Sequence, residues 1–262
     1  MPLDIDRFAH VMSPLQRWDP RVKLASLGVL VICISLVKTV PVGVMALMSA
    51  LVLVALASLP SSFILQGVKW VLVFLLPFLL IMPLSYPGEP AFHMLGLPFA
   101  WEGFRLAVLI VIKALAIVLC AYAMFGSSRF DISMIALQHL KCPKIIVQML
   151  LFTYRYVFVF LAEMQRMDVA MRARGFVKRA DRRTMQVMGD FVGTLLVRSF
   201  ERTERIYKAM LSKGYQGEFH TMVVFKADGK DMVKAVLVIS GAVLLLGMDL
   251  AGMFKIAEQG WY

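Results

Sequence analysis

Two similar heptapeptides carry the residues whose types and spacing point most directly to chemistry in this chain. AMRARGF occupies Ala170–Phe176 and AMLSKGY occupies Ala209–Tyr215, so each has a basic residue, a glycine and an aromatic residue in succession. A helix end that presents a cation beside an aromatic ring can dock into a socket on another protein. Two such ends suit a pair of related or identical subunits. The repeat therefore predicts an intracellular partner that comes in twos.

Helix termination by itself accounts for most of the repeated pattern. If Gly175 takes position C′, where the chain needs a positive φ, Arg174 becomes the C-cap. Phe176 and Met171 then take positions C″ and C3, which touch in a Schellman motif. The second copy offers the same four residue types, at Gly214, Lys213, Tyr215 and Met210. Two amphipathic helices with well-formed ends are thus a complete structural explanation, and only the basic residues call for a functional one.

Other residue patterns give no sign of catalysis or of a metal site. The chain contains neither G-x-x-x-x-G-K-[ST] nor G-x-G-x-x-G, the glycine-rich loops that cradle nucleotide phosphates. No paired carboxylates and no nucleophile beside a base are evident. The four histidines lack the spacing of a closed metal site, being scattered at His10, His93, His139 and His220. We expect a non-catalytic chain that binds no metal or cofactor of its own.

The composition identifies an integral membrane protein, because 60% hydrophobic and 17% charged residues exceed what a soluble core needs. A bilayer takes about 20 apolar residues per helix. Five runs predict spans, at Val22–Val37, Val42–Leu59, Val68–Leu84, Phe104–Phe125 and Ala235–Phe254. Pro77 and Pro83 are expected to kink or shorten the third. The expected fold class is all-α, a polytopic membrane helical bundle with cytoplasmic coupling helices.

The distribution of Lys and Arg predicts the orientation, because cytoplasmic loops near spans are rich in them. The segment before the first span is basic, whereas Ser85–Gly103 has no Lys or Arg, so the N-terminus is expected inside. Residues 126–234 hold 19 of the 28 basic residues and 10 of the 17 acidic ones, and are also expected inside. A sixth apolar run, Ile145–Ala162, is therefore interpreted as packed or partly embedded from the inside.

The chain is thus expected to be a multi-pass protein of the cell inner membrane in three parts. Residues 1–125 form a cytoplasmic N-terminal segment and four spans. Residues 126–234 form a cytoplasmic coupling region. Residues 235–262 form the last span and an external C-terminus.

Lys113 lies near the middle of the fourth predicted span and has two competing interpretations. A cation at that depth can pair with a carboxylate of a partner protein, which would make it functional. It can equally face the interior of its own bundle, where it would pair internally or extend toward the membrane surface. The sequence does not choose between them.

The run Arg172–Arg183 carries six basic residues and one acidic residue. Nucleic acid is not expected as its partner, because its one aromatic residue is used by the helix end and no known binding module is present. Anionic headgroups of the lipid bilayer are the expected partner, at about 1 kcal/mol per charge. Lipid binding of this kind can coexist with docking of a protein.

Several of these residues resemble the T component of energy-coupling-factor transporters, a transmembrane scaffold. That family is marked by two Ala-Arg-Gly-like motifs at the ends of coupling helices, and this chain has Ala173-Arg174-Gly175 and Ser212-Lys213-Gly214. The family also has an Asp-Pro-Arg-x-Lys sequence before its first span, matched here by Asp19, Pro20, Arg21 and Lys23. The stretch IDRFAHVMSPL is similar to the cobalt-type and nickel-type members in particular.

The resemblance implies a role in ATP-driven uptake. Two ABC-type ATPase subunits would bind the two motifs and hold the ATP, and a separate S-type membrane subunit would bind the substrate. That substrate would be a transition metal ion, cobalt first and nickel next. Lys213 departs from the family pattern, and lysine lacks the planar donor fork of arginine, so the second contact is expected to be weaker or differently shaped.

Three alternatives stay open at the level of sequence. The chain could serve a transporter for another micronutrient such as a vitamin. It could be a stand-alone channel or secondary transporter, although no inverted repeat of broken spans is evident. It could also be a membrane enzyme, for which no reactive constellation is visible. Co-purification with ATPase chains would favour the scaffold.

Overall fold

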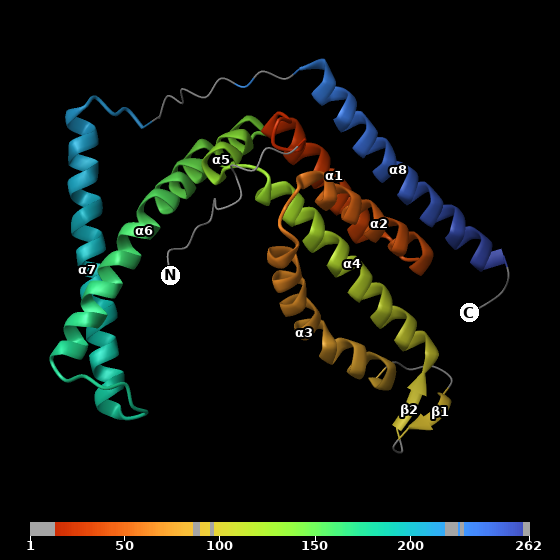
Figure 1. The fold of residues 1–262 in the computed structure, drawn as a ribbon, viewed down its shortest axis with the longest axis horizontal. Helices are drawn as coiled ribbons and strands as arrows, with labels where there is room; N and C mark the ends of the chain where they lie inside the picture. The colour runs from red at the N-terminus through yellow and green to blue at the C-terminus, as the bar shows by residue number, and fades with distance from the viewer. Residues whose placement is uncertain (1–13, 86–89, 95–96, 218–224, 226–227, 259–262) are drawn as a thin grey trace. The chain divides into compact units, whose positions relative to one another are not determined.

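The structure is a computed structural model, and it describes residues 14–85, 90–94, 97–217, 225 and 228–258. The described residues form eight helices and a pair of short strands (Figure 1). The helices are α1 Pro20–Leu36, α2 Val40–Ala57, α3 Ser61–Ser85, α4 Trp101–Gly126, α5 Phe130–His139, α6 Lys144–Ala173, α7 Arg182–Ser212 and α8 Gly229–Glu258. The strands are β1 Pro90–Met94 and β2 Leu97–Ala100.

The all-α polytopic class is confirmed, since five helices are long and apolar enough to cross a membrane. Four of them, α2, α3, α4 and α8, match predicted spans. The fifth is α6, which contains Ile145–Ala162. Length and composition therefore favour α6 as a span, and the prediction that it does not cross rests on charge distribution alone. The first predicted span corresponds to α1, whose 17 residues make it about 25 Å long, short of a bilayer core of about 30 Å.

Two local features lie between the second and fourth predicted spans, where the prolines were expected to kink or shorten the third span. The prolines at 77 and 83 do not shorten α3, which runs through both of them for 25 residues. Membrane helices tolerate proline because neighbouring groups satisfy the carbonyls that it leaves free. The connection from α3 to α4 contains the antiparallel pair β1–β2, in which Phe92 lies opposite Phe99. No strand was predicted there.

The chain divides into two compact units. One consists mainly of Lys141–Val224 and contains α6 and α7. The other combines Ile5–Leu140 with Phe225–Tyr262 and contains the remaining helices. Within the described residues, the chain thus leaves the second unit after Leu140 and belongs to it again from Phe225.

In the larger unit, the bundle, α1 and α4 are the central helices. The first packs against α8, α4 and α5, and the second packs against α1, α2 and α3. Their shared interior is built largely from small side chains, including the fully buried Ala46, Ala50, Ala116, Cys120 and Ala123. Small residues let helix backbones approach closely, which is how membrane helices gain packing energy without a hydrophobic driving force between them.

Candidate functional site

The first heptapeptide ends α6 with the predicted backbone geometry. Gly175 has φ of +80°, and Arg174 is the C-cap. The N–H of Phe176 donates to the carbonyl of Met171 at 3.1 Å, and the N–H of Gly175 donates to that of Arg172 at 3.0 Å. These are the two hydrogen bonds of a Schellman motif, so the predicted helix end is confirmed.

The second heptapeptide repeats this geometry at the end of α7. Gly214 also has φ of +80°, with Lys213 as the C-cap. The N–H of Tyr215 donates to the carbonyl of Met210 at 3.0 Å, and that of Gly214 donates to Leu211 at 2.9 Å. Each basic residue therefore lies at the negative end of a helix dipole, where a cation contributes about 0.3–1 kcal/mol when exposed.

The surroundings of the two ends differ. Next to the first, Asp168 pairs with Arg172 at 2.8 Å and with Lys178 at 3.2 Å, whereas Arg174 forms no ion pair within the described part of the chain. Next to the second, the hydroxyl of Tyr215 donates to Oε1 of Gln148 at 3.3 Å, which ties this end to the start of α6. Both Arg174 and Lys213 are exposed, and their charges are available to a partner.

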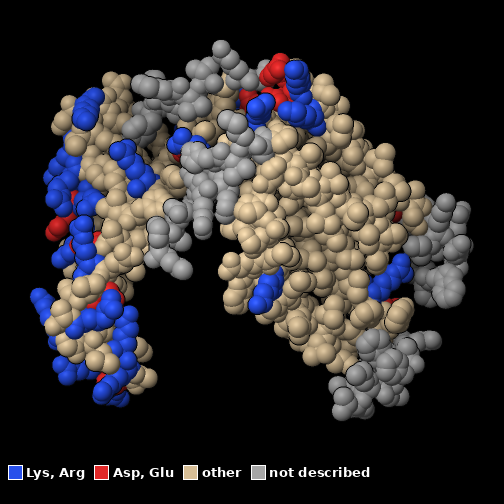
Figure 2. Space-filling view, viewed as in Figure 1, with Lys and Arg blue, Asp and Glu red and all other residues tan. Residues whose placement is uncertain are grey.

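Basic side chains gather over α6 and α7, whereas charged side chains are fewer on the visible face of the bundle and gather mainly at one end of it (Figure 2). Midway along the pair of helices, the guanidinium of Arg198 in α7 pairs with Glu163 in α6. Arg166 lies 3.8 Å from the same carboxylate. This half-exposed ion pair connects α6 to α7, and both motif ends lie in the same compact unit.

The start of α7 is capped by Asp181, whose carboxylate accepts a hydrogen bond from the N–H of Thr184 at 2.7 Å. Hydrogen bonding by Thr184, through its side chain and its backbone, holds the pKa of Asp181 below its ordinary value. The ionised carboxylate also lies at the positive end of the helix dipole. The cap is thus strongest when Asp181 is charged.

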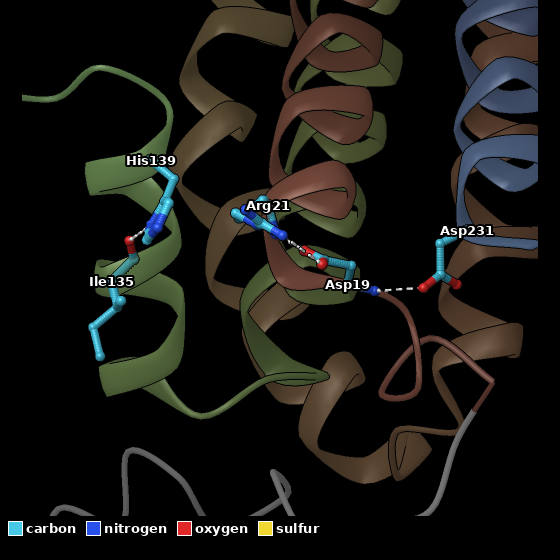
Figure 3. Close-up of polar contacts among 5 residues, drawn as sticks. All are labelled: Asp19, Arg21, Ile135, His139 and Asp231. Atoms are coloured by element: carbon cyan, nitrogen blue, oxygen red, sulfur yellow. Dashed lines mark hydrogen bonds and ion pairs between the residues drawn. The ribbon is translucent and has the colours of Figure 1, made fainter. Parts of the chain in front are cut away.

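The Asp-Pro-Arg-x-Lys sequence forms the start of α1. Asp19 is the N-cap, accepting from the N–H of Arg21 at 2.9 Å, and Pro20 takes the first helical position, where its missing N–H costs nothing. The Arg21 guanidinium also pairs with Asp19 at 3.2 Å. In turn, the N–H of Asp19 donates to Asp231 of α8 at 3.2 Å (Figure 3). The motif therefore fastens α1 to α8.

Lys23 joins the same helix to the end of α4. Its side chain is fully buried, and Nζ donates to the hydroxyl of Ser127 at 2.9 Å and also to that of Ser128. Ser127 is the C-cap of α4, so this ammonium lies at the negative end of that helix. The part of the chain matched to the family motif thus holds α1, α4 and α8 together at one end of the bundle.

Lys113 makes its contacts inside the bundle. Its Nζ donates to the carbonyls of Ser35 at 2.5 Å and Val37 at 2.8 Å, which belong to the end of α1. These two carbonyls satisfy the Lys113 ammonium within its own bundle. The geometry therefore supports internal pairing over pairing with a carboxylate of a partner protein.

Sequence reasoning missed Asp249, an acidic residue that completes the turn between α1 and α2. The carboxylate of Asp249 in α8 accepts from the N–H groups of Lys38 and Thr39 at 3.0 and 2.9 Å and from the Thr39 hydroxyl at 2.6 Å. The signal in the sequence was a single acidic residue in the last apolar run. A charged side chain within the membrane costs free energy, so it usually has a binding partner or a functional role. Asp249 satisfies the N–H groups at the start of α2, as Lys113 satisfies the carbonyls at the end of α1.

No metal cluster is found among the residues that the structure describes. His139 contacts the carbonyl of Ile135 and the ring of Phe225, and no other histidine shares its surroundings in that part of the chain. His10 and His220 lie outside the described residues, and so does the side chain of His93. In the described part of the chain, the site therefore consists of helix ends that present charge.

The fold and these helix ends define a polytopic helical membrane protein with a charged helix pair. The chain matches the CbiQ family model, described as cobalt transport protein, over residues 12–223, and it belongs to that family of membrane transport proteins.

Curated relatives are similar over long parts of their sequences. The energy-coupling factor transporter transmembrane protein EcfT of Bacillus subtilis is 25% identical over 228 residues, which cover 81% of this chain and 84% of the relative. The cobalt transport protein CbiQ of Rhodobacter capsulatus is 25% identical over 154 residues, 58% of this chain and 62% of the relative. The EcfT of Heliobacterium modesticaldum is 29% identical over 103 residues, 39% of each.

Proposed function

We propose that this chain is the transmembrane scaffold of an energy-coupling-factor importer. It couples ATP hydrolysis by two partner ATPase subunits to uptake through a separate substrate-binding membrane subunit. The observation that carries the proposal is the pair of Schellman helix ends, each of which leaves one exposed cation at the same place. A pair of equivalent ends fits a pair of equivalent sockets.

The mechanism follows from the connections of these ends. ATP-bound and nucleotide-free ATPases must favour different arrangements of α6 and α7, since a ligand shifts an equilibrium only by its differential affinity for the two states. The Arg198–Glu163 ion pair makes the two helices respond together. In this proposal α6 and α7 are cytoplasmic, the ATP is held by the partners, and this chain is non-catalytic.

Cobalt is the proposed substrate, with nickel second. The description of the matched family and the name of the Rhodobacter capsulatus relative support cobalt. The EcfT names of other relatives carry no metal, so a vitamin is the alternative that the assay must include. Uptake of radiolabelled cobalt, nickel and vitamins by cells that express the complex would distinguish these substrates.

The test of the proposed function is the variant Arg174→Glu. It keeps Gly175 and hence the helix end, but it reverses the exposed charge, so ATP-driven uptake is expected to fall to background while the protein still inserts. The matched control is Arg179→Glu, since Arg179 is exposed, lies outside both motifs and forms no side-chain ion pair among the described residues. Undiminished uptake by Arg174→Glu, or failure of the wild-type chain to co-purify with an ATPase, would contradict the proposal.

A further inference from the structure

Leu140, where the described chain leaves the bundle, and Phe225, where it belongs to the bundle again, lie beside an aromatic contact. His139, the last residue of α5, meets Phe225 edge to face, with ring centroids 5.2 Å apart and planes at 83°. Edge-to-face pairs of this kind are favourable beyond their buried area. The points of exit and return are therefore joined directly.

A third element meets the same ring. The guanidinium carbon of Arg21 lies 4.9 Å from the centroid of Phe225, within cation–π distance. Both neighbours of the ring are held by their own helices. Arg21 pairs with Asp19 of α1, and Nδ1 of His139 donates to the carbonyl of Ile135 in α5 at 3.1 Å (Figure 3). Phe225 thus lies between two side chains that are already fixed.

The start of α8 does not depend on Phe225 for its attachment to α1. The indole N–H of Trp18 donates to the carbonyl of Asp231 at 3.1 Å, and the carboxylate of Asp231 accepts from the N–H of Asp19. Because these bonds hold the bundle side of the return segment, loss of the Phe225 ring is expected to leave the bundle assembled. Loss of the ring removes the contact between the end of α5, where the chain leaves the bundle, and Phe225, where it belongs to the bundle again.

We infer that Phe225 is a positioning residue that links the end of α5, from which the chain continues into α6, to the start of α1. Displacement at the Arg174 end travels along α6 toward the end of α5. The stack of His139, Phe225 and Arg21 delivers this displacement to the start of α1. This inference rests on the proposed function, because it takes α6 and α7 as the helices that the ATPases move.

The experiment compares Phe225→Ala with Phe225→Tyr in the whole complex reconstituted in liposomes. Cobalt uptake and ATP hydrolysis are measured together, after normalising to inserted protein. Uptake per ATP hydrolysed is expected to fall about tenfold in Phe225→Ala, the factor that corresponds to losing an aromatic pair and a cation–π contact together. Phe225→Tyr keeps the ring and is expected to stay close to wild type, and both variants should still co-purify with the ATPases.

Phe63→Ala is the matched control, because Phe63 makes an edge-to-face pair with Tyr122 inside the bundle, with centroids 5.5 Å apart and planes at 75°. An unchanged uptake ratio in Phe225→Ala would overturn the inference, as would an equal loss in Phe63→Ala or loss of the ATPases from Phe225→Ala. If the wild-type chain neither transports nor binds an ATPase, the proposed function fails instead. The double variant His139→Ala/Phe225→Ala is expected to be no worse than Phe225→Ala, since Phe225→Ala by itself already removes the contact with His139.

Discussion

At the scale of single residues, the two heptapeptides separate a structural task from a functional one. The glycines are required by backbone conformation alone, because a Cβ at Gly175 or Gly214 would meet no other atom within 4 Å while φ is +80° at both. The basic residue before each glycine has no such constraint. Arg174 offers a planar fork of donors and Lys213 a single ammonium, so two equivalent helix ends present unequal hydrogen-bond donors.

The requirement for glycine can be tested by the same change, glycine to alanine, at a position with positive φ and at a position without it. Gly175→Ala forces a Cβ into the left-handed region and is expected to destabilise the end of α6 by about 1–2 kcal/mol. Gly189→Ala, within α7, has open space and no positive φ, so it is expected to stabilise that helix by about 0.5–1 kcal/mol. Hydrogen exchange of the last-turn amides of α6 and of the amides around Gly189 measures both effects. Equal responses would contradict the conformational explanation.

At the scale of elements, several charged residues of this chain act at helix ends. Asp19 caps the start of α1 and Asp181 the start of α7, while Lys23 lies at the end of α4. Each charge has the sign that its end of the helix dipole favours. Sequence reasoning assigned Asp19 and Lys23 to the Asp-Pro-Arg-x-Lys motif. Their contacts at the helix ends give a physical reason for these two residues in this chain.

The cap of α7 predicts a pH dependence. The pKa of Asp181 is lowered in the folded chain, so the stability that it adds is present above the unfolded pKa of about 3.9 and is lost as pH falls through the lower folded value. Exchange of the Thr184 amide is therefore expected to accelerate in acid relative to amides in the middle of α7. Asp181→Asn should keep the cap without this dependence, and Asp181→Ala should lose the cap at every pH.

At the scale of the whole molecule, the turn between α1 and α2 is held by two helices that are distant in sequence. Lys113, halfway along α4, satisfies carbonyls at the end of α1, and Asp249 of α8 satisfies N–H groups at the start of α2. Backbone at membrane depth must find partners within the protein, because the bilayer core offers none. The short α1 is compatible with the bundle for this reason.

Removal of the acid at this turn has a definite expected cost. Asp249→Ala leaves the N–H groups of Lys38 and Thr39 and one hydroxyl without an acceptor, and is expected to destabilise the bundle by at least about 2 kcal/mol. Asp190→Ala, at an exposed position of α7, is expected to stay within about 0.5 kcal/mol of wild type. Thermal unfolding in mild detergent measures both, and comparable melting temperatures would refute the structural role of Asp249.

Local chemistry determined a large part of this protein from its sequence. Apolar runs of sufficient length predict the helices of the bundle, and Gly175 and Gly214 predict two Schellman ends, because both depend on residues that are close in the chain. Capping by Asp19 belongs to the same local level. The resemblance to the T component of energy-coupling-factor transporters agreed with the family match.

Only the tertiary structure decided which distant charges and rings meet. Asp249 reaches residues about 210 positions away, Lys113 turns to the end of α1, and Phe225 lies between Arg21 and His139. Such contacts depend on how helices pack side by side, and periodicity within one segment carries no information about its neighbour. The residues that join the motif helices to the bundle therefore became visible only in the packed molecule.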